Sequence, residues 1–210
     1  MAAAPGSSCH TNFNTTITCY MNTEKAQDIA EEIIGLYQQH GGAEYAGEPV
    51  TQLEHMVQSA QLAEQQGYDE EVILAAFLHD IGHICVSAQG DNEMDGYGIK
   101  DHEEVGGEFL REKGFSKRLI RLVEAHVEAK RYLTLKSPDY YERLSDASKK
   151  TLEYQGGRMS EEEAAAFEQH PLFDLIINMR RWDEEAKIEA VPVPDLAKYR
   201  DMLFRHLQAQ

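Results

Sequence analysis

Positive charge is scarce in this sequence, which has 20 Lys and Arg against 37 Asp and Glu among 210 residues and a formal net charge of −17 at pH 7. Nucleic acids and anionic membranes are bound through basic surfaces, so this excess of acid argues against both as partners. Long apolar runs are also missing, and none approaches the ~18 residues of a membrane span.

Cysteine is rarer still, with residues only at Cys9, Cys19 and Cys85. The number is odd, and the spacings do not match paired metal ligands. Cys85 lies between two apolar residues and is read as a buried free thiol, which predicts a reducing cytoplasm.

Residues 1–20 lack the basic and apolar regions of a signal peptide, so we predict a flexible extension there and one folded unit over 21–210.

Alternating strand patterns are absent, whereas apolar residues recur with the helical period along most of the chain. Caps and glycine stops divide the pattern into segments. The predicted helices are residues 26–39 with Thr23 as cap, 49–66, 70–83, 102–112, 116–130, short pieces within 133–159, one from Ser160, 173–187 and 195–207. These signals predict an all-α fold. The glycine-rich residues 86–100 are predicted to form a loop beside the active site.

The predicted helix 70–83 is almost entirely apolar, yet it contains the pair His79-Asp80. Burial of an imidazole and a carboxylate costs free energy unless both groups have interaction partners. A metal ion is a common partner for such a pair. Further histidines and an aspartate occur beside apolar residues elsewhere in the chain. Together the candidate metal ligands are His55, His79, Asp80, His102, His126 and Asp183. Six ligands exceed the needs of one open site, so we predict two metal ions that share Asp80.

Other readings of these residues stay open at this point. A single histidine on an apolar face is more often a core residue with an ordinary hydrogen-bond partner, but six buried polar groups would each need one. The set could also stabilise a helical module that has no catalytic role. Against that, Lys130 lies one turn from His126 and Arg180 one turn from Asp183. Such spacing places two cations beside the ligands, where they would suit an anionic ligand.

The order His…His-Asp…His…His…Asp resembles the HD-domain superfamily in its two-metal form. Further segments resemble one branch of it, the mixed-valent diiron oxygenases that break the carbon–phosphorus bond of aminophosphonates. The matching segments are Tyr45–His55, His79–His83, Gly96–Gly98, Glu124–Leu133, Leu144–Ser148, Leu152–Gly157 and Arg181–Asp183. The resemblance covers about residues 37–187 and implies an HD-domain helical bundle.

The resemblance also implies roles for individual residues. One iron would be held by His55, His79, Asp80 and Asp183, and the second by Asp80, His102 and His126. Tyr45 would cover the second iron until substrate arrives, and Glu48 would meet the amino end of the substrate. The groups expected around the phosphonate are His83, Lys130, Ser148, Thr151 and Arg180.

The implied cofactors are two iron ions as an Fe(II)/Fe(III) pair, with O₂ as cosubstrate. The expected reaction converts 1-hydroxy-2-(trimethylammonio)ethylphosphonate to glycine betaine and phosphate, or the non-methylated 2-amino-1-hydroxyethylphosphonate to glycine and phosphate. The alternative is a metal-dependent phosphohydrolase of the same superfamily, which uses the same six ligands. The segment with Tyr45 and Glu48 favours the oxygenase.

Overall fold

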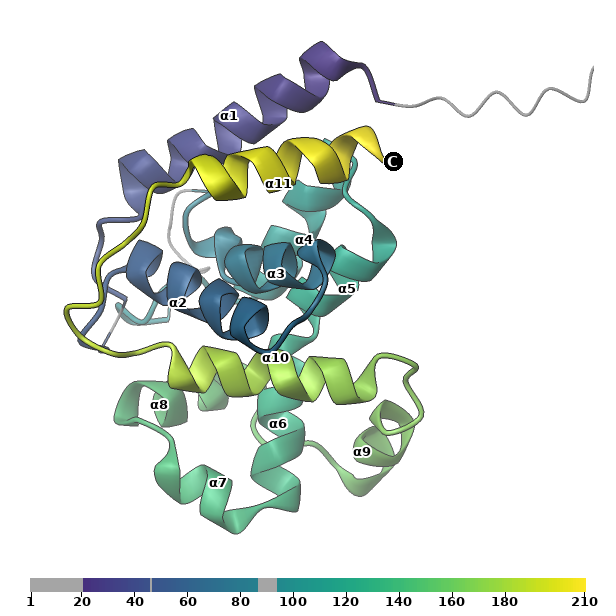
Figure 1. Ribbon diagram of the computed structural model, residues 1–210. Coiled ribbons are helices and arrows are strands. Elements are labelled where there is room, and N and C mark those ends of the chain that lie inside the picture. The colour runs from purple at the N-terminus through teal and green to yellow at the C-terminus, as the bar shows by residue number, and fades with distance from the viewer. Residues whose placement is uncertain (1–20, 46, 87–93) are drawn as a thin grey trace, which may run out of the picture.

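The computed structural model describes residues 21–45, 47–86 and 94–210, and it confirms the predicted all-α fold (Figure 1). Within these ranges the only β-type pairing is an isolated bridge between Glu44 and Thr51. The predicted extension, residues 1–20, lies outside the described residues. The helices are α1 Thr23–His40, α2 Gln52–Gln65, α3 Glu70–Leu78, η1 Ile81–His83, α4 His102–Lys113, α5 Lys117–Glu124, α6 His126–Lys136, α7 Pro138–Arg143, α8 Asp146–Tyr154, α9 Glu161–Phe167, α10 Phe173–Glu185 and α11 Ala197–Gln208.

Helix α3 forms the centre of the core, because every side chain from Val72 to Leu78 is buried. Helices α2, α5, α10 and α11 all contact it. The first and last helices, α1 and α11, lie side by side on one side of α3 (Figure 1). From α1, the hydroxyl of Tyr37 donates a hydrogen bond of 2.5 Å to the Phe77 carbonyl. Burial of apolar surface around α3 therefore fixes where its C-terminal end points.

The predicted continuous helix 70–83 is wrong, because α3 ends at Leu78 and a 3₁₀ turn follows from Ile81 to His83. His79 caps the helix and bonds through Nδ1 to the Ala76 carbonyl at 2.8 Å. Asp80 then has φ −105° and ψ 16°, outside the helical range. The His-Asp pair therefore lies at a helix end, where a turn directs both side chains to one point.

A second predicted helix, residues 116–130, is two helices in the structure. α5 ends at Glu124, Ala125 forms the junction, and His126 opens α6. The His126 ring bonds through Nδ1 to the Val123 carbonyl at 2.7 Å. The apolar stripe continues through the junction, so the hydrophobic pattern did not reveal the break.

Helix α2 begins three residues later than the predicted start at Pro49. Thr51 is its N-cap, and a capping box with Glu54 joins the side chain of each residue to the backbone of the other. Before it, the Tyr45 amide bonds to the Val50 carbonyl and the Glu48 amide to the Tyr45 carbonyl, at 2.9 and 2.8 Å. This tight turn replaces the first predicted helical residues. Smaller shifts occur at Asn22, which caps α1 in place of Thr23, at the end of α10 and at both ends of α11.

Close backbone contact joins η1 to α4. A Cβ added to Gly82 would lie 1.9 Å from the His102 carbonyl oxygen, so only glycine permits this approach. The contact brings Asp80 and His102 to the same site. Of the predicted loop 86–100, residues 87–93 lie outside the described residues, while Gly98 has φ +97° and its backbone passes close to the His83 ring.

None of the helices in the described ranges has the length and apolar character needed to cross a membrane.

The contact at Gly82 gives a test of this packing. We expect Gly82→Ala to lower the free energy of unfolding of the metal-free protein by about 1–3 kcal/mol, because the new methyl group overpacks a backbone contact. Gly35→Ala in α1 is the matched control, since no atom lies within 4 Å of its Cβ position. It should be neutral or stabilising by up to about 1 kcal/mol. Urea denaturation measures both, and equal stability of the two variants would contradict the packing argument.

Candidate active site

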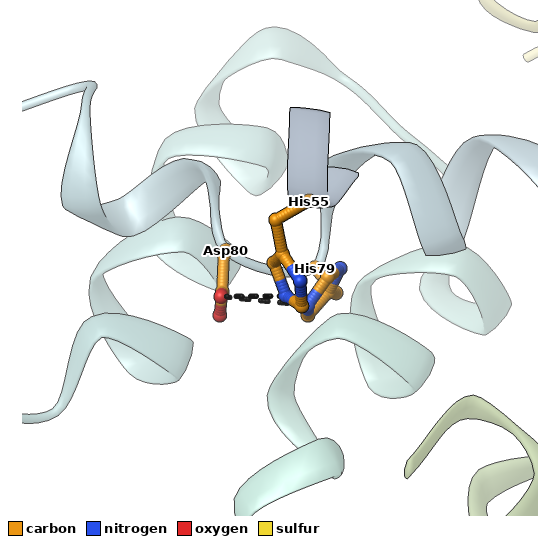
Figure 2. A group of neighbouring side chains, drawn as sticks. All are labelled: His55, His79 and Asp80. Atoms are coloured by element: carbon orange, nitrogen blue, oxygen red, sulfur yellow. Dashed lines mark hydrogen bonds and ion pairs between the residues drawn. The ribbon is translucent and has the colours of Figure 1, made fainter. Parts of the chain in front are cut away.

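Asp80 lies at the centre of the predicted ligand set. Its Oδ2 is 3.5 Å from His55 Nε2 and 3.4 Å from His79 Nε2, two contacts that Figure 2 shows. Its Oδ1 faces the other way, 3.2 Å from His102 Nε2 and 3.4 Å from His126 Nε2. Each carboxylate oxygen therefore faces its own pair of imidazoles. This is the arrangement expected of a carboxylate that bridges two cations.

Asp183 joins the first of these pairs from α10. Its Oδ1 lies 3.5 Å from His55 Nε2, and its Oδ2 forms an ion pair with Arg180. The structure thus brings all six predicted ligands together from α2, the end of α3, α4, α6 and α10. All six side chains are buried.

Backbone carbonyls fix the orientation of the four imidazoles. The Nδ1 atoms bond to Ala186, Ala76, Ile99 and Val123 carbonyls, for His55, His79, His102 and His126 respectively, at 2.7–3.2 Å. A carbonyl accepts a proton only from Nδ1–H, so in each neutral ring the Nε2 lone pair is free. His55 and His79 then face each other with Nε2 atoms 3.0 Å apart, and His102 and His126 at 2.9 Å. Such pairs of lone pairs need a cation between them.

The carboxylate oxygens also indicate that the site binds a cation. Both Asp80 oxygens and Asp183 Oδ1 are buried without a hydrogen-bond partner among the described residues. Burial acts to raise the pKa of Asp80, but the neighbouring His79 and the other imidazoles hold it well below its usual value. Burial lowers the pKa of His55, yet the nearby carboxylates of Asp183 and Asp80, each 3.5 Å from its Nε2, outweigh this and raise it to about 9. The site therefore attracts positive charge, and its nitrogen and oxygen donors suit a transition-metal ion.

His83 also approaches the cluster, and its ligand atom lies within 4.8 Å of those of Asp80 and His102. In the other four rings Nδ1 donates a hydrogen bond, whereas in His83 Nδ1 accepts one. The Ile99 amide donates to His83 Nδ1 at 3.1 Å, so the neutral ring carries its proton on Nε2. Burial and the nearby His102 lower its pKa to about 3, which keeps the ring neutral. His83 is thus a hydrogen-bond donor at the cavity, whereas His126 supplies a free lone pair.

A cavity of about 50 Å³ opens onto Asp80, His102 and His126. All five residues predicted to contact a phosphonate line it: His83, Lys130, Ser148, Thr151 and Arg180.

Lys130 is the most exceptional of these groups, because its buried ammonium is held by two uncharged oxygens. It donates to Thr151 Oγ1 at 2.6 Å and to Gln155 Oε1 at 3.0 Å. Burial and the neighbouring Arg180 lower its pKa well below the usual range. A dianion bound between Lys130 and Arg180 would supply the missing negative charge.

Tyr45 and Glu48 form another wall of the cavity. The Tyr45 ring stacks on His55 with centroids 4.1 Å apart, and burial together with Asp80 raises the pKa of its phenol well above the usual value. Glu48 forms an ion pair with Lys187 at 2.9 Å and accepts a hydrogen bond from Ser145.

Several neighbours of the site were not predicted from the sequence, among them Gln155, Tyr140 and Lys187. Gln155 lines the cavity one turn after Thr151, within a segment already singled out, so helical spacing could have found it. Tyr140 accepts a hydrogen bond from Arg180 Nε at 2.8 Å, and Lys187 reaches Glu48 across 139 residues of sequence. No local pattern marks either of these two.

Comparison with known proteins identifies the family to which this chain belongs. The HD domain family matches residues 53–189, a range that contains all six candidate ligands. The chain belongs to the HD-domain family. The resemblance predicted from the order of histidines and aspartates is thereby confirmed.

Within this HD-domain family, the chain is similar to two enzymes named for phosphonates. It is 44% identical over 178 residues to [1-hydroxy-2-(trimethylamino)ethyl]phosphonate dioxygenase (glycine-betaine-forming) of Leisingera caerulea, covering 85% of this chain and 90% of that protein. It is 42% identical over 166 residues to hydroxymethylphosphonate dioxygenase of Gimesia maris, covering 78% and 81%. An uncharacterized protein of Acanthamoeba polyphaga mimivirus is 42% identical over 191 residues, covering 90% and 87%.

The bridging position of Asp80 leads to a prediction about metal content. We expect the loaded wild-type protein to retain two metal ions per chain and Asp80→Ala to retain fewer than one, because both ligand sets lose a shared oxygen. His83→Gln is the control and should keep two, since His83 presents a donor and no lone pair. Elemental analysis after desalting measures the ratio, with circular dichroism as a check of folding. Two ions retained by Asp80→Ala would exclude the bridging role.

Proposed function

We propose that this protein uses O₂ to break the carbon–phosphorus bond of a small 1-hydroxyalkylphosphonate. The overall reaction, R–CH(OH)–PO₃²⁻ + O₂ → R–COO⁻ + HPO₄²⁻ + H⁺, balances without a further reductant. The two substrates predicted from the sequence are 1-hydroxy-2-(trimethylammonio)ethylphosphonate, which yields glycine betaine, and 2-amino-1-hydroxyethylphosphonate, which yields glycine.

The observation that carries this proposal is that one cavity is lined by two kinds of group. They are the second ligand set, Asp80, His102 and His126, and the basic side chains of Lys130 and Arg180. A small molecule with an anionic phosphonate at one end could contact both. Both named relatives are dioxygenases of such molecules.

In this proposal the cofactors are two iron ions, one held by His55, His79, Asp80 and Asp183, the other by Asp80, His102 and His126. The nitrogen and carboxylate donors fit iron, and the unpartnered oxygens of Asp80 and Asp183 fit a cation on each side. Bound as an Fe(II)/Fe(III) pair, iron would supply the redox chemistry with O₂.

The protein groups bind and orient the substrate. Lys130 and Arg180 balance the phosphonate charge, and the hydroxyls of Ser148 and Thr151 and Nε2–H of His83 add donors around it. Arg180 is held in place by Tyr140 and Asp183, so the guanidinium is oriented before substrate binds. Tyr45 would cover the second iron until substrate enters; its ring stacks on His55 of the first ligand set, and it lines the same cavity as His102 and His126.

The relatives do not fix the group R. One is named for a trimethylammonium compound and the other for hydroxymethylphosphonate, which carries no cation. The proposal therefore covers the shared hydroxyphosphonate end, where Lys130 and the ligand set lie.

The decisive experiment separates oxidation from hydrolysis. Protein loaded with Fe(II) without O₂, then partly oxidised, is mixed with hydroxymethylphosphonate or the trimethylammonium substrate, with and without O₂. We expect phosphate release only when O₂ is present, and an electron paramagnetic resonance signal that changes on substrate binding. Phosphate released from phosphate esters without O₂ would replace this proposal with the phosphohydrolase alternative.

The role of Lys130 gives a second expectation. Lys130→Met should raise KM for the phosphonate about tenfold to a hundredfold, because a hydrogen bond to a charged group contributes about 1.5–3 kcal/mol. Lys136→Met is the control on the same helix, since Lys136 forms exposed ion pairs with Glu161 and Glu168 and should leave KM unchanged. Steady-state phosphate release measures both, and an unchanged KM for Lys130→Met would remove Lys130 from the binding site.

A further inference from the structure

Glu48 is the one acidic residue among the described lining groups that is not a candidate metal ligand. A cationic substituent on a substrate would be drawn to it, because Asp80 and Asp183 are committed to the ligand sets. Yet Glu48 already has a cationic partner. Lys187 Nζ lies 2.9 Å from Glu48 Oε1, and Ser145 Oγ donates to the same oxygen at 2.5 Å.

This ion pair is shielded from solvent, unlike most in the molecule. The side chains of Glu48 and Lys187 are 8% and 13% exposed. A shielded pair is screened little by salt, so the charge of Lys187 cancels that of Glu48 at this wall of the cavity.

The position of Lys187 is fixed by the ligand cluster itself. It lies four residues after Asp183, and the carbonyl of its neighbour Ala186 accepts the hydrogen bond from His55 Nδ1 at 2.9 Å. Its ammonium also lies 3.4 Å from Ser148 Oγ, so it contacts two residues that line the cavity, Glu48 and Ser148, from behind the cavity wall.

We propose that Lys187 is a specificity-determining residue that neutralises Glu48, the carboxylate to which a cationic substituent of the substrate would be drawn. With this charge supplied by the protein, the cavity accepts a 1-hydroxyalkylphosphonate whose R group is hydrogen or a small uncharged group. A substrate with its own ammonium must compete with Lys187 for Glu48 before it gains the same contact. This inference rests on the proposed function, since it concerns the substrate of that reaction.

The test compares two substrates in three variants. Lys187→Met removes the ammonium, Lys187→Arg keeps a cation at the same place, and Lys150→Met is the control because it breaks an exposed ion pair with Glu153 on α8. The substrates are hydroxymethylphosphonate and 1-hydroxy-2-(trimethylammonio)ethylphosphonate. The quantity measured is the ratio of their kcat/KM values, together with the ratio of their Kd values for iron-loaded protein without O₂. A loss of phosphonate affinity common to both substrates cancels in each ratio.

We expect Lys187→Met to shift both ratios at least tenfold toward the trimethylammonium substrate, because Glu48 is then an unpaired carboxylate. Lys187→Arg should stay within about threefold of wild type, and Lys150→Met should not differ from it. If wild type releases phosphate with O₂ but Lys187→Met leaves both ratios unchanged, this inference fails while the proposed function stands. If wild type oxidises neither substrate, the proposed function fails and this inference with it. Thermal denaturation shows whether each variant is folded, and a misfolded Lys187→Met is replaced by Lys187→Gln with the same expectation.

Discussion

The burial of Asp80 without a hydrogen-bond partner is the constraint around which the rest of the structure is arranged. A buried carboxylate is costly, and four imidazoles whose protons are all given to backbone carbonyls add four lone pairs to the same small volume. Only cations relieve both costs together. Because the candidate ligands come from helices far apart in the chain, binding of those cations would also hold α2, α4, α6 and α10 in place around the end of α3, so metal binding would be coupled to folding.

The cost of burying Asp80 without a partner also explains which site residues could be predicted from the sequence. Four of the candidate ligands lie beside apolar residues in the sequence, namely His55, His102, His126 and Asp183. Polar residues in apolar surroundings indicate that they share a binding partner. The helical period gave the all-α class and most of the elements, because the amphipathic faces around α3 follow it closely. The spacing of Lys130 from His126 and of Arg180 from Asp183 placed two cavity groups correctly, since residues one helical turn apart share a face.

The parts that could not be predicted depend on contacts between distant segments. Helices α3 and α5 each end where a ligand histidine bonds to the carbonyl three residues before it, and nothing in the apolar pattern marks those bonds. The approach of Gly82 to His102 depends on the packing of η1 on α4. The pairing of Glu48 with Lys187 spans most of the chain and involves a lysine just past a helix end, where a charged residue is ordinarily solvated.

The hydrogen bond from His55 to the Ala186 carbonyl gives the end of α10 several functions at once. Residues 183–187 carry a candidate metal ligand, an acceptor that orients a second one, and the counter-ion of Glu48. An insertion or a proline in this segment would therefore disturb all three together. Glu48 lies on a separate turn with no candidate ligand within six residues of it. A substitution of Glu48 would change the charge of this cavity wall with less disturbance of the ligand set than an insertion after α10.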